Sequence, residues 1–391
     1  MRPTAVTPPD GLHVGSSPPD RYNGFPRRRT GVGPSRSKRE VIGGFRRGRM
    51  TDQDTAFTPE AAVDHCRRHG VVPEGAAATA RSLGGGVSNH VYEVTWEDGC
   101  VVVKRPLPNL AVEEDWPADV DRVHNEAAAI RTYASVLADA DLAARVPGVV
   151  SETDDHVVAI ECAPADATMW KAELLDGRVD AAVAAAVGEV LGTVHDAVAD
   201  DPAVRETFAD KRPFDQLRVD PYHRATARRH PDVADAIRTE IDRIMDVSRT
   251  LVHGDYSPKN VLVDRRSGAV PWVLDFEVAH WGDPAFDTAF MCNHLYIKSI
   301  YNHGAHEAYA DAAARFWDAY DAAVAWDIEH ETVRELAVLM LARVDGKSPV
   351  EYVEREAVAD ALRRVAKATL RGEAATLDEF AALAREEAAA L

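Results

Sequence analysis

Apolar and polar side chains alternate between residues 79 and 104, which is the pattern of half-buried β-strands. Two turn signals, Gly84–Gly86 and Asp98–Gly99, divide this stretch into three strands. Two further apolar runs, near 148–152 and 156–162, flank a polar turn and predict a second hairpin. This part of the chain is therefore expected to form a sheet.

Helical spacing dominates the remainder of the chain. A first helix is expected after Thr58, whose side chain can cap it, with Pro59 at its first position, and a second over 118–138. After Pro164 the apolar residues recur at intervals typical of helices. The predicted helices lie near 180–199, 232–247, 284–301, 305–324, 328–344, 353–371 and 376–390, and a short strand-rich insert lies at 250–276.

These patterns together predict an α+β fold with two lobes. Residues 50–163 would form a small lobe on an antiparallel sheet, and residues 164–391 a larger, mainly helical lobe. Candidate chemistry is considered within this organisation.

Charge is unevenly distributed along the 391 residues. The chain has 45 Lys and Arg against 64 Asp and Glu, a formal net charge of −19. Residues 1–49 contain eleven Lys and Arg but three acidic residues, so the rest of the chain carries −27. A body of that charge would repel a polyphosphate backbone, which argues against nucleic acid as a partner.

The first 49 residues show neither strand alternation nor helical spacing. They contain pairs of residues that disfavour helices and strands, such as Pro8–Pro9 and Gly43–Gly44, which predicts disorder. A basic arm for nucleic acid or membranes is one interpretation. A targeting peptide is another, although no apolar stretch follows the charges. We prefer a mis-assigned translation start, because Met50 is followed by an acidic segment and then by the first predicted helix.

The cysteines and the apolar runs bear on the compartment. Cys66, Cys100, Cys162 and Cys292 are far apart without a Cys-x-x-Cys pair, which favours a reducing environment and argues against a disulfide framework. No uninterrupted apolar run approaches the roughly 18 residues of a membrane-spanning helix. We therefore expect a cytoplasmic protein without a membrane partner.

Two short segments each place a carboxylate directly after an apolar strand. In the first, His253-Gly254-Asp255 is followed on the same loop by Asn260; in the second, Asp275 follows Trp272-Val273-Leu274. Two carboxylates and an amide provide hard oxygen ligands, which suit Mg²⁺ bound together with substrate phosphates. These residues are the candidates for the centre of a site.

A glycine-rich turn and a lysine in the small lobe indicate phosphate binding. Gly84-Gly85-Gly86 lets backbone N–H groups approach a phosphate, although a plain hairpin would also explain the glycines. Lys104 lies mid-strand among valines, where a lysine is costly unless its charge is paired. Glu126 on the next predicted helix is its natural partner, and Glu113 and Glu114 are alternatives.

In this order, the motifs resemble those of the aminoglycoside phosphotransferase/choline kinase superfamily, small-molecule kinases with the bilobal protein-kinase-like fold. The resemblance covers residues 75–345 and rests mainly on His-Gly-Asp-x-x-x-x-Asn at 253–260, followed by Asp-Phe-Glu at 275–277. It implies transfer of the γ-phosphate of ATP to a hydroxyl of a small-molecule acceptor, with ATP and Mg²⁺ as cofactors. It also implies that Asp255 is the catalytic base and that Asn260, Asp275 and Glu277 bind the metal.

The resemblance assigns nucleotide contacts as well. The implied residues are Gly84, Gly85, Gly86, Ser88, Lys104, Glu126, Glu161 and Cys162. The last two lie in a hinge at 160–164, whose backbone would bind adenine. His253 would buttress the loop of the catalytic base, and Asp287 would hydrogen-bond that loop. Lys259 would face either the γ-phosphate or solvent.

Two differences from related kinases reduce the range of activities that the resemblance allows. Gly254 stands where protein kinases have arginine, and seven residues separate Phe276 from Pro284, too few for a long peptide-binding segment. Asp-Phe-Glu at 275–277 resembles choline, ethanolamine and methylthioribose kinases more than antibiotic-modifying enzymes. The alternative from another class is a catalytically silent, pseudokinase-like nucleotide-binding protein.

The acceptor stays open among amino-alcohol, sugar and amino-sugar. Residues 214–222 and the helices after Asp287 are expected to shape its pocket, and Arg218, Trp170 and Trp281 are compatible with a neutral sugar. A group of Cys292, His294, His303 and His306 matches no standard zinc spacing and is interpreted as part of a helix on the acceptor side.

Overall fold

A computed structural model describes residues 57–84, 87–111, 116–142 and 146–391. Residues Gln53–Leu391 form one compact unit. Several predictions concern residues outside the described ranges, namely the basic leader, the start at Met50, and the residues Gly85, Gly86, Glu113 and Glu114.

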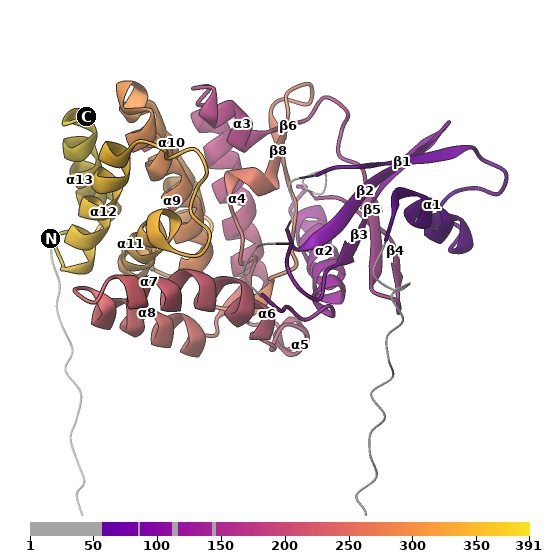
Figure 1. Cartoon of the computed structure of the whole chain (residues 1–391), viewed down its shortest axis with the longest axis horizontal. Helices are drawn as coiled ribbons and strands as arrows, with labels where there is room; N and C mark the ends of the chain where they lie inside the picture. The colour runs from indigo at the N-terminus through magenta and orange to yellow at the C-terminus, as the bar shows by residue number, and fades with distance from the viewer. Residues whose placement is uncertain (1–56, 85–86, 112–115, 143–145) are drawn as a thin grey trace, which may run out of the picture. The chain divides into compact units, whose positions relative to one another are not determined.

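The small lobe is built on an antiparallel five-stranded sheet in the order β1-β2-β3-β5-β4 (Figure 1). Its strands are β1 (Ala78–Ser82), β2 (Asn89–Trp96), β3 (Gly99–Pro106), β4 (Val149–Thr153) and β5 (Val157–Glu161). The alternation that predicted strands is confirmed, and the Asp98–Gly99 turn joins β2 to β3.

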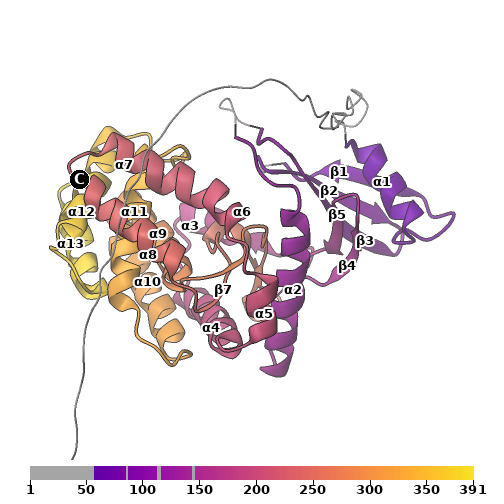
Figure 2. The ribbon, with the colours of Figure 1, turned by 90° about the horizontal axis from the view of Figure 1, so that it is seen from below.

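Helices α1 (Pro59–Arg68) and α2 (Arg122–Asp139) cover opposite faces of this sheet (Figure 2). The alternation of side chains along β5 shows why. Val157 and Ala159 join the apolar cluster that includes α1, whereas Val158 and Ile160 join the cluster that includes α2. The sheet is therefore buried on both sides. Thr58 caps α1, as its sequence predicts, by accepting from the N–H of Ala61 at 3.2 Å.

The large lobe is mainly helical, and the seven long helices predicted after Pro164 are confirmed to within a few residues. Its helices are α3 (Trp170–Leu175), α4 (Ala181–Val198), α5 (Pro202–Thr207), α6 (Arg212–Phe214), the π-helix η2 (Asp215–Arg224), α7 (Ala225–Arg229), α8 (Ala234–Asp246), α9 (Ala285–Tyr301), α10 (His306–Asp321), α11 (Glu329–Asp345), α12 (Glu356–Leu370) and α13 (Leu377–Ala389), with 3-10 turns η3 (Pro258–Asn260) and η4 (His303–Ala305).

Helices α4 and α10 pack unusually closely because α4 presents glycines at the contact. A Cβ at Gly188 would lie 2.1 Å from the carbonyl oxygen of Phe316, and one at Gly192 would lie 2.9 Å from that of Tyr320. Within the described ranges, α4 is also the one helix long and apolar enough to cross a membrane, a stretch that the sequence analysis did not anticipate. Its contacts with α10 are those of a buried core helix.

Short strands in the large lobe deliver the polar loops of the site. They are β6 (Thr168–Met169), β7 (Thr250–Val252), β8 (Val261–Asp264), β9 (Val270–Val273) and β10 (His280–Gly282). β7 pairs with β10, and β8 pairs with both β6 and β9. The loop at 253–257 follows β7, and the loop at 274–279 joins β9 to β10. These two loops carry Asp255 and Asp275.

The expectation that the chain has no disulfide is wrong, because Cys100 and Cys162 are bonded. They are 62 residues apart in sequence, which hid the pairing. In the sheet Val101 lies opposite Glu161, so the next antiparallel pair is Cys100 and Cys162, with Cα atoms 5.9 Å apart. Cys66 and Cys292 are free and buried. The cysteine argument for a reducing compartment therefore fails.

Candidate active site

Asp255 lies directly after β7 and is buried. Three donors meet at its Oδ2: Nη2 of Arg218, Nζ of Lys259 and Nδ2 of Asn260, each at 2.9 Å. Lys259, which was expected to face phosphate or solvent, is therefore ion-paired with Asp255. The hydrogen bonds of the described residues fix one carboxylate oxygen and leave Oδ1 for a further donor.

The backbone of this loop is anchored by Asp287, in the first turn of α9. Its two carboxylate oxygens accept from the N–H groups of His253, at 2.6 Å, and Gly254, at 2.9 Å. Gly254 has a φ of +79°, and a Cβ there would lie 2.6 Å from the carbonyl oxygen of Val278. A side chain such as arginine would not fit, which gives a physical reason for the glycine before Asp255.

His253 joins the two polar loops. Its Nδ1 accepts from the N–H of Asp255, and its Nε2 donates to the carbonyl of Leu274, each at 3.1 Å. Burial lowers the pKa of His253, so the ring is neutral, as one accepting and one donating nitrogen require. The ring is a buttress in this arrangement, which agrees with its sequence interpretation.

Asn260 and Asp275 are held side by side. The N–H of Leu274 donates to the carbonyl of Asn260 at 2.9 Å, which brings the residue before Asp275 next to Asn260. The Asn260 amide nitrogen donates to Asp255, so its Oδ1 is oriented as the free acceptor of that side chain. Asp275 has a φ of +71°, a strained backbone geometry that is typical of functional positions. An amide oxygen and a carboxylate of this kind fit the donor set that Mg²⁺ prefers.

Lys104 on β3 is buried and contacts two carboxylates. Its Nζ lies 2.5 Å from Oε1 of Glu126, on α2, and 3.1 Å from Oδ1 of Asp275. Burial alone would lower the pKa of Lys104, but Asp275 and Glu126 outweigh it and raise that pKa. Lys104 is therefore cationic, and it contacts Glu126, the partner favoured from the sequence, in addition to Asp275.

Glu277 connects the lobes. Its Oε2 accepts from Nε of Arg122 at 3.0 Å and from Nδ2 of Asn89 at 2.9 Å. Arg122 also donates to the carbonyls of Ser88 and Leu107. One of the two carboxylate oxygens of Glu277 is thus engaged by protein donors, and Arg122 and Asn89 are site residues that the sequence analysis missed.

A signal for Arg122 was present in the sequence. Arg122 precedes Glu126 by four residues on α2, so both side chains lie on the same helix face. Arg122 contacts Glu277 of the loop at 274–279 directly, and Glu126 contacts Lys104, which in turn contacts Asp275 of that loop. Asn89 had no comparable signal, because a turn-forming asparagine is a sufficient explanation at a strand start.

The predicted phosphate turn and hinge are described in part. Gly84 has a φ of +63°, a conformation favoured by glycine, and Ser88 accepts at its Oγ from Nδ2 of Asn89 at 3.2 Å. At the hinge, the N–H of Glu161 donates to Gly148 at 2.9 Å. This N–H is therefore already used within the small lobe.

The charge on Asp255 is set by competing effects. Burial would raise the pKa of Asp255, but Arg218 and Lys259 outweigh burial and lower it below its usual range. Asp275 is similar: burial raises its pKa, and Lys104 and Lys259 lower it further than burial raises it. Both groups are carboxylates throughout the neutral range.

Cations extend from Asp255 toward α9 and α11. The guanidinium groups of Arg218 and Arg343 lie 5.8 and 5.6 Å from the ring centroid of Tyr222, on η2. Lys298 on α9 is fully buried and donates to the carbonyl of His294 at 3.2 Å. Burial, Lys171 and Arg343 lower the pKa of Lys298 to about 7. Among the described residues, no carboxylate lies within ion-pair distance of Lys298.

Other residues suggested for the acceptor side take different places. Trp170 and Trp281 are buried core residues. In the group of Cys292, His294, His303 and His306, the first two lie on α9, His303 lies in η4 and His306 begins α10, so the group spans three elements and not one helix.

The model of a family described as "Phosphotransferase enzyme family" matches residues 79–336. No match was found among curated proteins.

Several solved structures are similar. Amicoumacin kinase hAmiN, in complex with AMP-PNP and Ca²⁺, is 14% identical with a TM-score of 0.50, covering 81% of this chain and 97% of its own. A choline/ethanolamine kinase family protein from Mesorhizobium loti is 19% identical with a TM-score of 0.49, covering 83% and 99%. Macrolide 2′-phosphotransferase MphH from Brachybacterium faecium is 19% identical with a TM-score of 0.43, covering 80% and 98%. The similarity is one of fold: the chain has the bilobal kinase-like architecture predicted from its sequence.

Proposed function

The chain belongs to the phosphotransferase enzyme family, and from that premise we propose that it transfers the γ-phosphate of ATP to a hydroxyl group of a small metabolite. The observation that carries the proposal is the meeting of Asp255, Asn260, Asp275 and Lys104 in one network. Phosphoryl transfer depends mainly on positioning and charge neutralisation, and these residues supply both.

Nucleotide binding is proposed for the small lobe. Lys104 is cationic and held by Glu126 at the edge of the Asp275 loop, where it can contact the phosphates. The turn at 84–88 would cover the phosphates, and the backbone from Cys162 onward would bind adenine. The complex of hAmiN with AMP-PNP supports nucleotide binding by this fold.

Asn260 and Asp275 would hold a Mg²⁺ ion, because each has an oxygen that the described hydrogen bonds leave oriented for a ligand. When bound, the ion would neutralise charge on the phosphates. Glu277, expected as a third ligand, would bind through Oε1, because its Oε2 is engaged by Arg122 and Asn89. We propose that these contacts of Oε2 also position the two lobes.

Asp255 would orient the acceptor hydroxyl through Oδ1 and take its proton as the phosphate is transferred. Its lowered pKa makes it a weak base, which suits a loose transition state in which orientation matters more than basicity. Arg218 and Lys259 hold the carboxylate in place.

Among the acceptors left open by the sequence, the cations favour a sugar over an amino-alcohol or amino-sugar. Arg218 and Lys259 touch the catalytic carboxylate, and Arg343 lies beyond it on α11. A cationic acceptor would be repelled there, whereas hydroxyl and anionic groups can accept hydrogen bonds from these side chains.

The experiment is a phosphate-transfer assay with labelled ATP on acceptors sorted by charge: amino-alcohols, amino-sugars, neutral sugars and sugar acids. We expect label in neutral or anionic acceptors. Label in amino-alcohols alone would contradict the acceptor class but keep the kinase assignment. A nucleotide-dependent rise in melting temperature with no labelled acceptor would favour the silent, pseudokinase-like alternative.

A further inference from the structure

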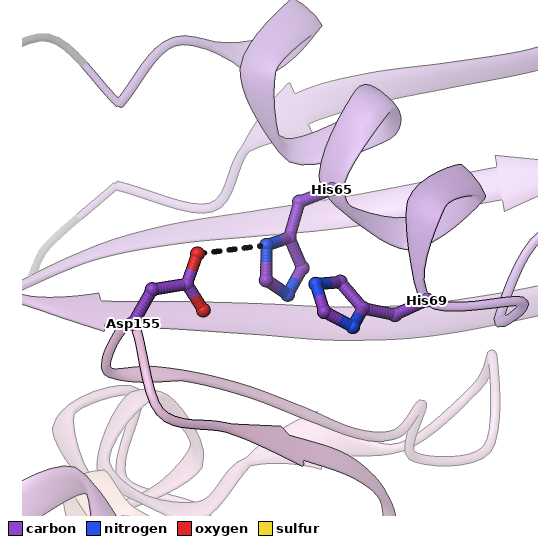
Figure 3. A group of neighbouring side chains, drawn as sticks. All are labelled: His65, His69 and Asp155. Atoms are coloured by element: carbon purple, nitrogen blue, oxygen red, sulfur yellow. Dashed lines mark ion pairs between the residues drawn. The ribbon is translucent and has the colours of Figure 1, made fainter.

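A cluster of His65, His69 and Asp155 lies on the small lobe, apart from the residues assigned above (Figure 3). His65 is in the last turn of α1 and His69 follows its end, four residues later, so both rings project from the same side of the helix. Asp155 comes from the turn between β4 and β5. Three potential ligands thus converge from two separate elements.

The spacing of the ligand atoms suits a metal ion. One ligand atom from each residue lies within 4.8 Å of the others. Nδ1 of His65 and Oδ2 of Asp155 are 3.5 Å apart, which is long for a hydrogen bond. In a tetrahedral zinc site, the metal–ligand distances place two such atoms roughly 3.4 Å apart. The rings of His65 and His69 face each other with centroids 4.4 Å apart.

His65 has an unmet requirement that a metal would satisfy. It is 1% exposed, and neither ring nitrogen has a hydrogen-bond partner among the described residues. An unsatisfied buried polar group costs about 1–3 kcal/mol, so its retention needs an explanation. A bond to a metal ion would supply one.

Two neighbouring groups differ in this respect. His156, on the same β4–β5 turn, contacts Asp121 at 2.8 Å. His124, on α2, contacts Glu152 at 2.6 Å. Both rings therefore already have carboxylate partners. Another group, Glu93 with Cys100 and Cys162, has its sulfurs joined in the disulfide. Among the described residues, His65 is thus distinguished by ring nitrogens that have no hydrogen-bond partner, its contact with Asp155 being longer than a hydrogen bond.

The protonation states also suit a metal. Burial lowers the pKa of His65, which keeps the imidazole neutral. Burial raises the pKa of Asp155, but hydrogen bonds to its carboxylate, the largest contribution coming from Thr153, outweigh burial and lower that pKa, which keeps the carboxylate ionised. Arg68 and Arg105 also act on His65 and weaken the attraction for any cation. The ion must therefore gain from nitrogen coordination, which favours transition metals over Mg²⁺ or Ca²⁺.

We propose that His65, His69 and Asp155 form a binding site for a divalent transition metal ion such as Zn²⁺, with water completing the coordination. The ion joins the end of α1 to the β4–β5 turn and so fastens the first helix to the sheet. Its effect is on the stability of the small lobe, since a ligand that binds only the folded state raises the melting temperature.

The test is a titration of ZnCl₂ into the full chain, followed by calorimetry and by melting temperature. Excess MgCl₂ occupies oxygen-rich sites, and reductant is omitted so that Cys100 and Cys162 stay bonded. We expect one Zn²⁺ bound and a rise in melting temperature. In His69→Gln, an exposed position, the Kd should rise by at least about 10-fold. His124→Gln is the matched control and should bind like the wild type.

Asp155→Asn provides a second variant if His69→Gln fails to fold, and it should weaken binding in the same direction. Equal Zn²⁺ affinity in the wild type and in these variants would overturn the proposal. Absence of Zn²⁺ binding to the wild type would overturn it as well, and so would an equal loss of affinity in His124→Gln.

Discussion

The two loops that carry Asp255 and Asp275 begin alike and are completed differently. Each follows a short apolar strand and places one aspartate at the site. Asp255 is surrounded by partners from the large lobe, Arg218 and Lys259. The cation in contact with Asp275 is Lys104, from the small lobe. The surroundings of Asp255, the proposed acceptor side, are therefore built within one lobe, whereas those of Asp275, the proposed phosphate side, depend on how the two lobes meet.

The largest effect on kcat is expected for a substitution at Asp255, whose partners among the described residues all come from the large lobe. Asp255→Asn keeps the shape of the side chain but removes the base, so kcat should fall by about 10²–10⁴-fold. ATP affinity should change little, because the proposed nucleotide contacts are made by Lys104 and other residues of the small lobe, not by Asp255. Kinetics combined with nucleotide binding measures both. Unchanged kcat in a folded variant would remove Asp255 from the chemistry.

Lys104→Met tests the surroundings of Asp275, to which both lobes contribute residues. We expect loss of ATP affinity and a loss of about 3–5 kcal/mol in the free energy of unfolding, because Glu126 is left buried and unpaired. The double variant Lys104→Met with Glu126→Leu should recover most of the stability, since both members of a buried pair are then apolar.

The double variant separates folding from function. Denaturant unfolding should show the recovery, and nucleotide titration should show that ATP affinity remains low. Recovery of ATP affinity along with stability would mean that Lys104 has a structural role alone.

A smaller effect is expected for Arg218→Gln. Arg218 depresses the pKa of Asp255, so the ionised carboxylate contributes stability that is present above its unfolded pKa of about 3.9 and is lost as pH falls through the lower folded value. Removing the cation raises that folded pKa. The acid limb of the pH profile of kcat/KM should therefore move to higher pH.

Lys259→Gln is the matched comparison for Arg218→Gln. Its side chain is 48% exposed, so solvent screens its charge more, and the shift of the acid limb should be smaller. A larger shift in Lys259→Gln than in Arg218→Gln would reverse the assignment of the dominant cation.

The smallest effect on chemistry is expected for Cys100→Ser. The disulfide joins β3 to the residue after β5, and its loss should lower the free energy of unfolding by about 2–4 kcal/mol. The Asp255 loop has no part in it, so kcat should stay near that of the wild type. Denaturant unfolding and steady-state kinetics check the two statements. A large fall in kcat would show that the large-lobe side also depends on the small lobe.

The contrast between residues placed by their own segment and residues placed by the other lobe also explains how much could be predicted from the sequence. Strand alternation, helix periodicity and the short spacing of Asp255 to Asn260 are local, and they located the sheet, the long helices and the polar loops. Lys104 was identifiable because a lysine among valines conflicts with burial. The Glu126 partner followed from the next helix.

What could not be predicted depends on contacts between distant segments. The Cys100–Cys162 bond follows from the register of β3 and β5, which spacing alone does not give. Arg218 reaches Asp255 from a π-helix in a stretch without clear helical periodicity. Glu277 matched a metal-ligand motif, but its partner Arg122 comes from 155 residues away. The position of Glu277 in the motif indicated which loop it lies on, but not that its side chain contacts Arg122.

Phosphorus NMR of the wild-type protein with ATP, Mg²⁺ and a mixture of sugars tests the central claim most directly. The account predicts that the γ-phosphate signal of ATP declines in step with the growth of a phosphate-ester signal, one ester for each ADP formed. An unchanged ATP signal, or release of inorganic phosphate without an ester, would contradict the proposed transfer to a hydroxyl acceptor.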